Sequence, residues 1–215
     1  MAFSMIVVGT SLGGLSALEV LLGGLPKNFA ASVAVVQHRH KSSSDRLSAI
    51  LQQYCSLPLG EAEDKEVIMP GRVYLAPSDY HLLVESVGHN TGQTYFALST
   101  DAPVCYSRPS IDVLFESAAD AYAERVIGVI LTGANHDGAE GLVKIKMRGG
   151  VAVVEEPATA FCRTMPEAAI AALKRISPLE LAGEKKGKAS SVASDSILPL
   201  SDIAPLLVNL LTVSC

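Results

Sequence analysis

The sequence predicts an α/β fold: a doubly wound, mainly parallel sheet with helices on both faces and a small antiparallel hairpin in the middle of the chain. Short apolar runs alternate with segments of helical periodicity, which is typical of βαβ units. Hydrophobic residues make up 49% of the 215 residues and charged ones only 18%, which suits strands buried on both faces. This length fits one domain, so we expect a single domain over residues 1–215.

The first half begins with two strand–helix units. Residues 5–8 and 32–36 are short apolar runs that predict strands. The helix after the first strand is predicted from leucines at helical spacing, namely Leu15, Leu18, Leu21 and Leu22. The serines at 42–44 are N-cap candidates for a second helix. Its inward residues are expected to be Leu47, Ile50, Leu51 and Tyr54.

The middle of the chain reads differently. Residues 72–76, 80–87 and 94–98 are strand-like. Residues 88–92 (GHNTG) lie between the last two of these segments and predict a hairpin loop.

In the second half the α/β alternation resumes. Ser110 is expected to cap a helix whose apolar stripe is Ile111, Val113, Leu114, Phe115, Ala118 and Tyr122. The remaining predicted elements are strands at 126–131 and 151–154 and helices at about 138–148, 166–173 and 201–211. Residues 183–196 (GEKKGKASSVASDS) lack apolar periodicity and predict a flexible surface loop.

Composition excludes several classes of protein. The net charge of −5 argues against nucleic acid or an anionic membrane as the main partner, because both require a basic surface. No apolar run reaches the ~18 residues that a membrane span needs, and the N-terminus lacks the basic residues of a signal peptide. The four cysteines are scattered without metal-ligand spacing, so we expect free thiols, no metal and a cytoplasmic location.

The loop after the first predicted strand is the first candidate site, because ligands bind beyond the carboxyl ends of parallel strands. It reads Gly-Thr-Ser-Leu-Gly-Gly over residues 9–14. A dinucleotide fingerprint needs glycine where Ser11 stands, and the Gly-Lys-Ser/Thr of a P-loop is missing. Residues 9–13 match the G-x-S-x-G pattern of a nucleophile elbow. Ser11 is therefore the candidate nucleophile, with a phosphate-binding or purely structural turn as alternatives.

A serine nucleophile needs a base to take its proton. His38 ends the second predicted strand, which commonly lies beside the first in such a sheet, so we select His38. His40 lies further into the loop, His81 inside a predicted strand and His89 in the hairpin loop. For any one of these histidines, an ordinary solvated residue is the alternative.

A carboxylate should hold the base in the correct tautomer. Asp137 follows the predicted central strand in the loop Thr-Gly-Ala-Asn-His-Asp-Gly, residues 132–138, and is our candidate. A helix N-cap is the alternative role of Asp137, and His136 is a rival for either role.

Longer stretches of the sequence resemble a known family. They are VVGTSLGGLSAL (7–18), VVQHRH (35–40), PGRVYLAPSDYHLLV (70–84), RPSIDVLFESAA (108–119), GVILTGANHDGAEGL (128–142) and EEPATAFCRTMPEAA (155–169). In this order they resemble the catalytic domain of the chemotaxis methylesterase family CheB, from about residue 5 to 182 and again near Ile197.

The resemblance implies a doubly wound α/β domain that hydrolyses glutamate methyl esters on the cytoplasmic helices of chemoreceptors, with glutamine deamidation as a second activity of some members. Its nucleophile, base and acid match Ser11, His38 and Asp137, the residues already selected. It implies no metal or organic cofactor. Arg46 and Arg108 are candidates for binding acidic groups near the methylation site, and Tyr80 and His81 for lining the cleft; ordinary surface or structural roles are the alternatives.

Two positions depart from the family pattern around the oxyanion site. Leu12 stands where the family usually has threonine, and Ala134-Asn135 replaces Met-Gly. Backbone N–H groups near Leu12 and Ala134 are the expected oxyanion donors, and these survive a change of side chain. Asn135 would be tolerated at positive φ, where asparagine is the best non-glycine residue.

Domain content is the larger departure. Many family members carry a receiver domain that blocks the active site until it is phosphorylated, and this sequence begins at the first strand of the esterase fold. Activity is then constitutive, or controlled by a separate regulatory protein, or the chain is a fragment. Two further alternatives are a catalytically weak receptor-binding module and an esterase or amidase with another substrate. A nucleotide-binding dehydrogenase ranks last because residue 11 is not glycine.

Overall fold

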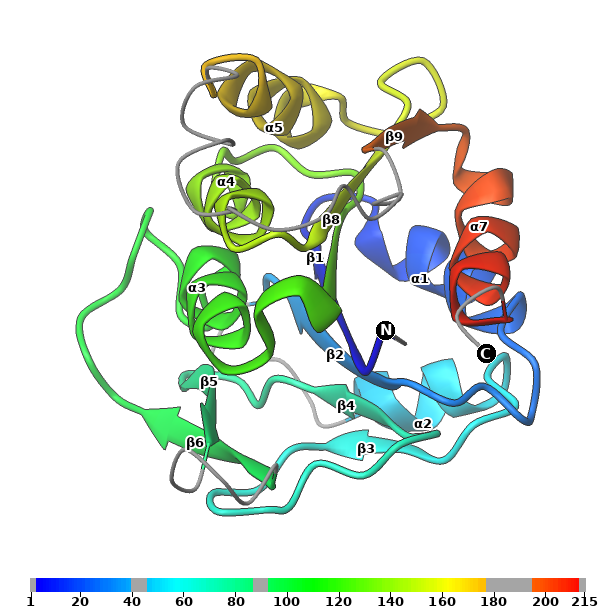
Figure 1. Cartoon of the computed structure of the whole chain (residues 1–215), viewed down its shortest axis with the longest axis vertical. Coiled ribbons are helices and arrows are strands. Elements are labelled where there is room, and N and C mark those ends of the chain that lie inside the picture. The colour runs from blue at the N-terminus through cyan, green and yellow to red at the C-terminus, as the bar shows by residue number, and fades with distance from the viewer. Residues whose placement is uncertain (1–2, 40–45, 87–92, 177–194, 213–215) are drawn as a thin grey trace, which may run out of the picture.

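The structure is a computed structural model, and it describes residues 3–39, 46–86, 93–176 and 195–212. Within these residues, one seven-stranded parallel sheet has the order β3-β4-β2-β1-β7-β8-β9, with helices on both faces (Figure 1). Its strands are β1 (Met5–Thr10), β2 (Ser32–Gln37), β3 (Leu59–Glu61), β4 (Val73–Leu75), β7 (Val126–Ile130), β8 (Val151–Glu155) and β9 (Ser196–Leu198). The predicted class is confirmed.

Two hydrophobic cores lie on opposite faces of the sheet. The helices are α1 (Gly14–Gly23), α2 (Arg46–Gln52), α3 (Ile111–Tyr122), α4 (Ala139–Met147), α5 (Thr164–Leu173) and α7 (Leu200–Thr212), with a 3-10 turn η1 (Ala123–Arg125). Helices α1, α2 and α7 cover one face, and α3, α4 and α5 cover the other (Figure 1). Successive strand residues point to opposite faces, so Met5 and Val7 enter the α3 core while Ile6 and Val8 enter the α1 core.

The predicted antiparallel hairpin is present. Strand β5 (His81–Ser86) pairs with β6 (Thr94–Ser99), and the pair packs against α3. The predicted loop at 88–92 lies outside the described residues, as do the serines at 42–44.

Some details of the prediction were wrong. In α2 Leu51 is buried and Leu47 is half-buried, whereas Ile50 is exposed; Tyr54, also exposed, lies beyond the end of this short helix. Leu15 is likewise exposed on α1. Strands β3 and β9 were missed, since each is a three-residue edge strand without a buried residue and so shows no apolar run. Most of the predicted loop at 183–196 lies outside the described residues, but its last residue, Ser196, begins β9.

The described helices are all too short or too polar to span a bilayer. The three cysteines among the described residues, Cys55, Cys105 and Cys162, are free thiols.

The strand order creates a topological switch point at the carboxyl ends of the central strands. From β1 the sheet grows through β2 and β4 on one side and through β7 and β8 on the other. Thr10 pairs with Gln37 of β2, and Gly9 pairs with Ile130 of β7, so the three strands end level. The loops after β1, β2 and β7 therefore meet, and such a point is where α/β sheets bind ligands.

Candidate active site

Ser11 and His38 are placed by backbone hydrogen bonds between the three strand ends. The Ser11 N–H donates to Thr132 O at 3.0 Å, and the His38 N–H donates to Thr10 O at 3.0 Å. The Gln37 amide donates to the carbonyl oxygens of both Ser11 and His38 at 2.9 Å. The expected proximity of β1 and β2 is confirmed, and Ser11 lies beside both other loops.

The turn after Ser11 depends on two glycines. Gly13 adopts φ 81°, which favours glycine, and it precedes the first residue of α1. A methyl group on Gly14 would lie 2.0 Å from Gln37 Oε1, so only glycine lets the helix start this close to β2. Ser11 is thereby held at the amino end of α1. Among the described residues, none hydrogen-bonds its hydroxyl, which leaves that oxygen open for chemistry.

His38 and Asp137 form a close pair. His38 Nε2 lies 2.8 Å from Asp137 Oδ2; the His38 side chain is 11% exposed and Asp137 is fully buried. Asp137 also accepts hydrogen bonds from Ser110 Oγ at 2.9 Å, Ile111 N at 2.7 Å and Asp112 N at 3.0 Å. Asp137 thus ties the base to the first turn of α3. It does not cap α4, the helix that follows it.

The surroundings of Asp137 favour its charged form. Burial raises the pKa of this carboxyl, but the hydrogen bonds from His38, Asp112 and Ile111 outweigh burial and hold the pKa below its usual value. A carboxylate only accepts hydrogen bonds, so His38 Nε2 carries the proton. The lone pair on Nδ1 is then the basic site of the imidazole.

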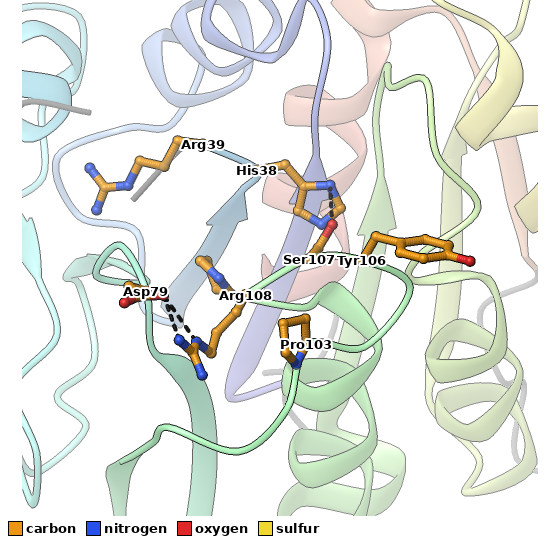
Figure 2. A pocket seen from close by; sticks show the side chains of 8 residues that line it. His38, Arg39, Asp79, Pro103, Tyr106, Ser107 and Arg108 are labelled. Carbon is orange, nitrogen blue, oxygen red and sulfur yellow. Dashed lines mark hydrogen bonds and ion pairs between the residues drawn. The ribbon is translucent and has the colours of Figure 1, made fainter. Parts of the chain in front are cut away.

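Ser107 is the site residue that sequence reasoning missed. Its hydroxyl lies 3.4 Å from His38 Nδ1. Figure 2 shows the two side chains facing each other. Asn135 Nδ2 lies 3.4 Å from the same oxygen and donates to Cys105 O at 2.9 Å. Ser107 directly precedes the Arg-Pro-Ser segment, but no spacing rule indicates that it reaches His38.

Asn135 fits its loop by a route other than positive φ. It is not among the described residues with positive φ. Its Oδ1 instead accepts from the backbone N–H of His136 at 2.6 Å and of Asp137 at 3.2 Å, so the side chain closes the loop itself.

The expected oxyanion donors have free backbone groups. In the described part of the chain, no acceptor receives the N–H of Leu12 or Ala134, whereas the neighbouring Ser11 and Gly133 N–H groups donate to Thr132 O and Cys162 O. Leu12 follows Ser11 and Ala134 follows Gly133, and a methyl group on Gly133 would lie 3.0 Å from Ser11 Cβ, so both free N–H groups lie near the nucleophile turn. This is the pattern that an oxyanion site requires.

A cavity of about 410 Å³ opens beside His38. Its lining includes His38, Arg39, Asp79, Tyr106, Ser107 and Arg108 (Figure 2). Arg108, one of the four predicted substrate contacts, is in this lining. Its guanidinium already donates to Asp79 Oδ1 at 2.6 and 3.1 Å and to two carbonyls, those of Thr100 and Asp101. Arg39, which was not predicted, pairs with Glu61 and donates to Ala76 O.

The other predicted substrate contacts do not line this cavity. Arg46 is the exposed first residue of α2, and Tyr80 is exposed on the turn before β5. His81 is buried; its Nδ1 accepts from Ser110 N at 3.2 Å and its Nε2 lies 3.1 Å from Ala102 O. Both ring nitrogens are therefore used, so His81 supports the loop before α3.

The rival histidines lie elsewhere. His136 is exposed, and its Nε2 lies 3.7 Å from Cys105 Sγ. His40 and His89 lie outside the described residues.

One cluster near the site combines ligand types that metals use. Cys105, Asp112 and Asp137 each place a ligand atom within 4.8 Å of the others. Each oxygen of Asp137 already accepts two hydrogen bonds, so its lone pairs are committed to His38 and α3. Asp137 therefore has no free lone pair for a metal ion, and the cluster is better described as two neighbouring carboxyl groups, those of Asp112 and Asp137.

Asp112 is the second carboxyl of this pair. Burial first, and then the negative charge of Asp137, raise its pKa to about 7 against the opposing effect of a hydrogen bond from Gly141 N at 2.7 Å. Cys105 and Glu116 also face it, and neither supplies a positive charge. Asp112 is therefore largely neutral below pH 7 and leaves Asp137 as the one anion behind His38.

We expect Asp112→Asn to change how stability depends on pH. A carboxyl whose pKa is higher in the folded than in the unfolded protein stabilises the fold as long as it is protonated in both states. This contribution is complete below the unfolded pKa of about 3.9 and is lost as pH rises to about 7. The variant lacks this loss, so its free energy of unfolding relative to that of wild type should rise by roughly 3 kcal/mol between pH 4.5 and pH 8. Urea unfolding at the two pH values measures this; a difference independent of pH contradicts the raised pKa.

Comparison with known proteins identifies the family. The CheB methylesterase profile matches residues 6–184, which is most of the chain. The chain belongs to the CheB methylesterase family. A relative from Leptospira interrogans, named putative protein-glutamate methylesterase/protein-glutamine glutaminase, is 42% identical over 98% of this chain and 96% of its own length.

Other CheB relatives are longer. A protein-glutamate methylesterase/protein-glutamine glutaminase from Thermotoga maritima is 36% identical over 77% of this chain but only 47% of its own length. The crystal structure of the Thermotoga maritima CheB methylesterase catalytic domain superposes with a TM-score of 0.83 at 31% identity, over 98% of this chain and 100% of that domain. The chain thus corresponds to the catalytic domain of these longer CheB proteins.

Proposed function

We propose that this protein is a serine hydrolase that removes methyl groups from glutamate γ-methyl esters of chemoreceptors. The observation that carries the proposal is the buried His38–Asp137 pair beside the Ser11 turn. The names of the CheB relatives supply the substrate class.

In the first half of the reaction, the Ser11 hydroxyl attacks the ester carbonyl carbon and its proton moves to His38 Nδ1. Asp137 stabilises the imidazolium that forms, through its 2.8 Å contact with Nε2. The N–H groups of Leu12 and Ala134 donate to the oxyanion, and one such donor typically contributes about 3 kcal/mol.

In the second half, the proton on Nδ1 passes to the methoxy oxygen and methanol leaves. His38 then takes a proton from water as the water attacks the acyl-enzyme, and collapse of the second tetrahedral intermediate returns the Ser11 hydroxyl and a free glutamate. The same steps with ammonia as the leaving group deamidate glutamine, the second activity in the relatives' names.

This function places the protein in the cytoplasm, with the cytoplasmic helices of a chemoreceptor as its partner. Arg108 supports the cleft through its hydrogen bonds to Asp79, and its position in the cavity lining supports a second role in substrate contact.

Methanol release tests the proposal. The purified protein is mixed with a chemoreceptor cytoplasmic fragment that has been methylated on its glutamates, and methanol and free carboxylates are counted. Equal amounts of both products are expected at catalytic enzyme concentration. Binding of the fragment without methanol would instead support a receptor-binding module, and hydrolysis of small esters alone would support a different substrate.

A further inference from the structure

The turn between Val104 and Ser107 holds an unusual conformation beside the active site. Val104 and Ser107 exchange backbone hydrogen bonds of 3.1 and 2.8 Å. The two residues between them, Cys105 and Tyr106, adopt φ 48° and 62°, a region that costs non-glycine residues about 1–2 kcal/mol each. The hydrogen bond from Asn135 Nδ2 to Cys105 O anchors the turn to the loop that carries Asp137.

This turn carries an aromatic side chain whose exposure has no explanation in the packing of the fold. Tyr106 is 100% exposed, and its ring extends away from the cavity (Figure 2). The next residue, Ser107, contacts His38 Nδ1. Strained backbone persists where it serves a function, and an exposed aromatic residue held rigidly loses little entropy on binding.

A second exposed aromatic residue borders the nucleophile turn. Phe161, between β8 and α5, is 79% exposed, and its Cβ would lie 2.6 Å from a methyl group on Gly13. Its loop is fixed through Cys162, whose N–H donates to Thr132 Oγ1 at 2.8 Å and whose carbonyl accepts from Gly133 N. Leu12, 53% exposed, lies one residue from Gly13.

Charge offers little for recognition at the cavity. The two arginines in its lining are paired, Arg39 with Glu61 and Arg108 with Asp79, so each positive charge is balanced. Among the described residues, three large apolar or aromatic side chains are exposed on the loops around Ser11 and His38, namely Leu12, Tyr106 and Phe161. Such residues dominate binding energy at protein interfaces.

We propose that Tyr106 and Phe161 are specificity-determining residues that bind apolar side chains of the substrate protein beside its esterified glutamate. This inference rests on the proposed function and names how the substrate is selected. A small ester is too short to cover these exposed rings, whereas a protein surface that delivers a glutamate side chain to Ser11 must cover the loops that carry them. The two rings should therefore strengthen the binding of protein substrates alone.

Steady-state kinetics with two substrates test the inference. We would compare wild type, Tyr106→Asn and Phe161→Ala on a methylated chemoreceptor cytoplasmic fragment and on p-nitrophenyl acetate. Asparagine tolerates positive φ, so it preserves the turn at 106. Each variant should raise KM for the receptor fragment about tenfold with kcat nearly unchanged, and should hydrolyse p-nitrophenyl acetate within twofold of wild type. Met147→Ala, an exposed apolar change at the far end of α4, is the matched control and should alter neither substrate.

An unchanged receptor KM in both variants overturns the inference while leaving the proposed function in place. An equal loss on both substrates also overturns it, because the residues would then act on the catalytic groups. If wild type releases no methanol from the receptor fragment, the proposed function fails and this inference fails with it.

Discussion

Ser11→Ala is expected to lower kcat for methyl-ester hydrolysis about 10⁵-fold, because members of a serine triad act as a unit. The residual rate comes from the oxyanion donors and substrate binding, so KM should change little. Methanol release in single-turnover and steady-state assays measures both constants, and circular dichroism confirms that the fold is retained.

Ser107→Ala is the matched control for this prediction. Ser107 Oγ lies 3.4 Å from His38 Nδ1, the basic nitrogen. Geometry alone therefore makes Ser107 a second candidate for the nucleophile. We expect its removal to lower kcat less than about tenfold, because Ser107 lies on the loop before α3 and not on the turn that carries the free N–H group of Leu12. The opposite ranking of the two variants would move the nucleophile to Ser107.

Asp137→Asn is expected to lower kcat about 10⁴-fold and to destabilise the fold by about 2–3 kcal/mol. Asp137 receives two donors on each oxygen, from His38 and Ile111 on Oδ2 and from Ser110 and Asp112 on Oδ1. An amide has one accepting oxygen, so its NH₂ must face a backbone N–H of α3 in either orientation. One orientation also forces His38 into the wrong tautomer.

Kinetics and urea unfolding at pH 7 measure the two effects. Asp120→Asn is the matched control, since Asp120 is a half-exposed carboxylate of the same helix α3 that pairs with Lys144 and Arg148. That variant should stay within twofold in kcat and within about 0.5 kcal/mol in stability. Near-normal activity of Asp137→Asn would remove Asp137 from the catalytic groups.

Local pattern was enough to predict much of the sheet. β1, β2, β7 and β8 are apolar runs buried on both faces, and such runs are visible in one dimension. His38 and Asp137 were predicted from a topological rule, because polar residues after neighbouring parallel strands must share an edge. Helical spacing failed at α2, where Ile50 has the expected spacing but only Leu51 is buried, and where Tyr54 lies beyond the end of the helix.

The sequence by itself determined the fold class, the family and the three residues Ser11, His38 and Asp137 as candidates, because each depends on order along the chain. Only the tertiary structure decided how these groups are connected. It placed Asp137 under the first turn of α3, 26 residues from Ile111 in sequence, and thereby assigned the proton to His38 Nε2. It also brought Ser107 to Nδ1 and engaged Arg108 with Asp79. Such contacts depend on packing between distant segments, which no local pattern encodes.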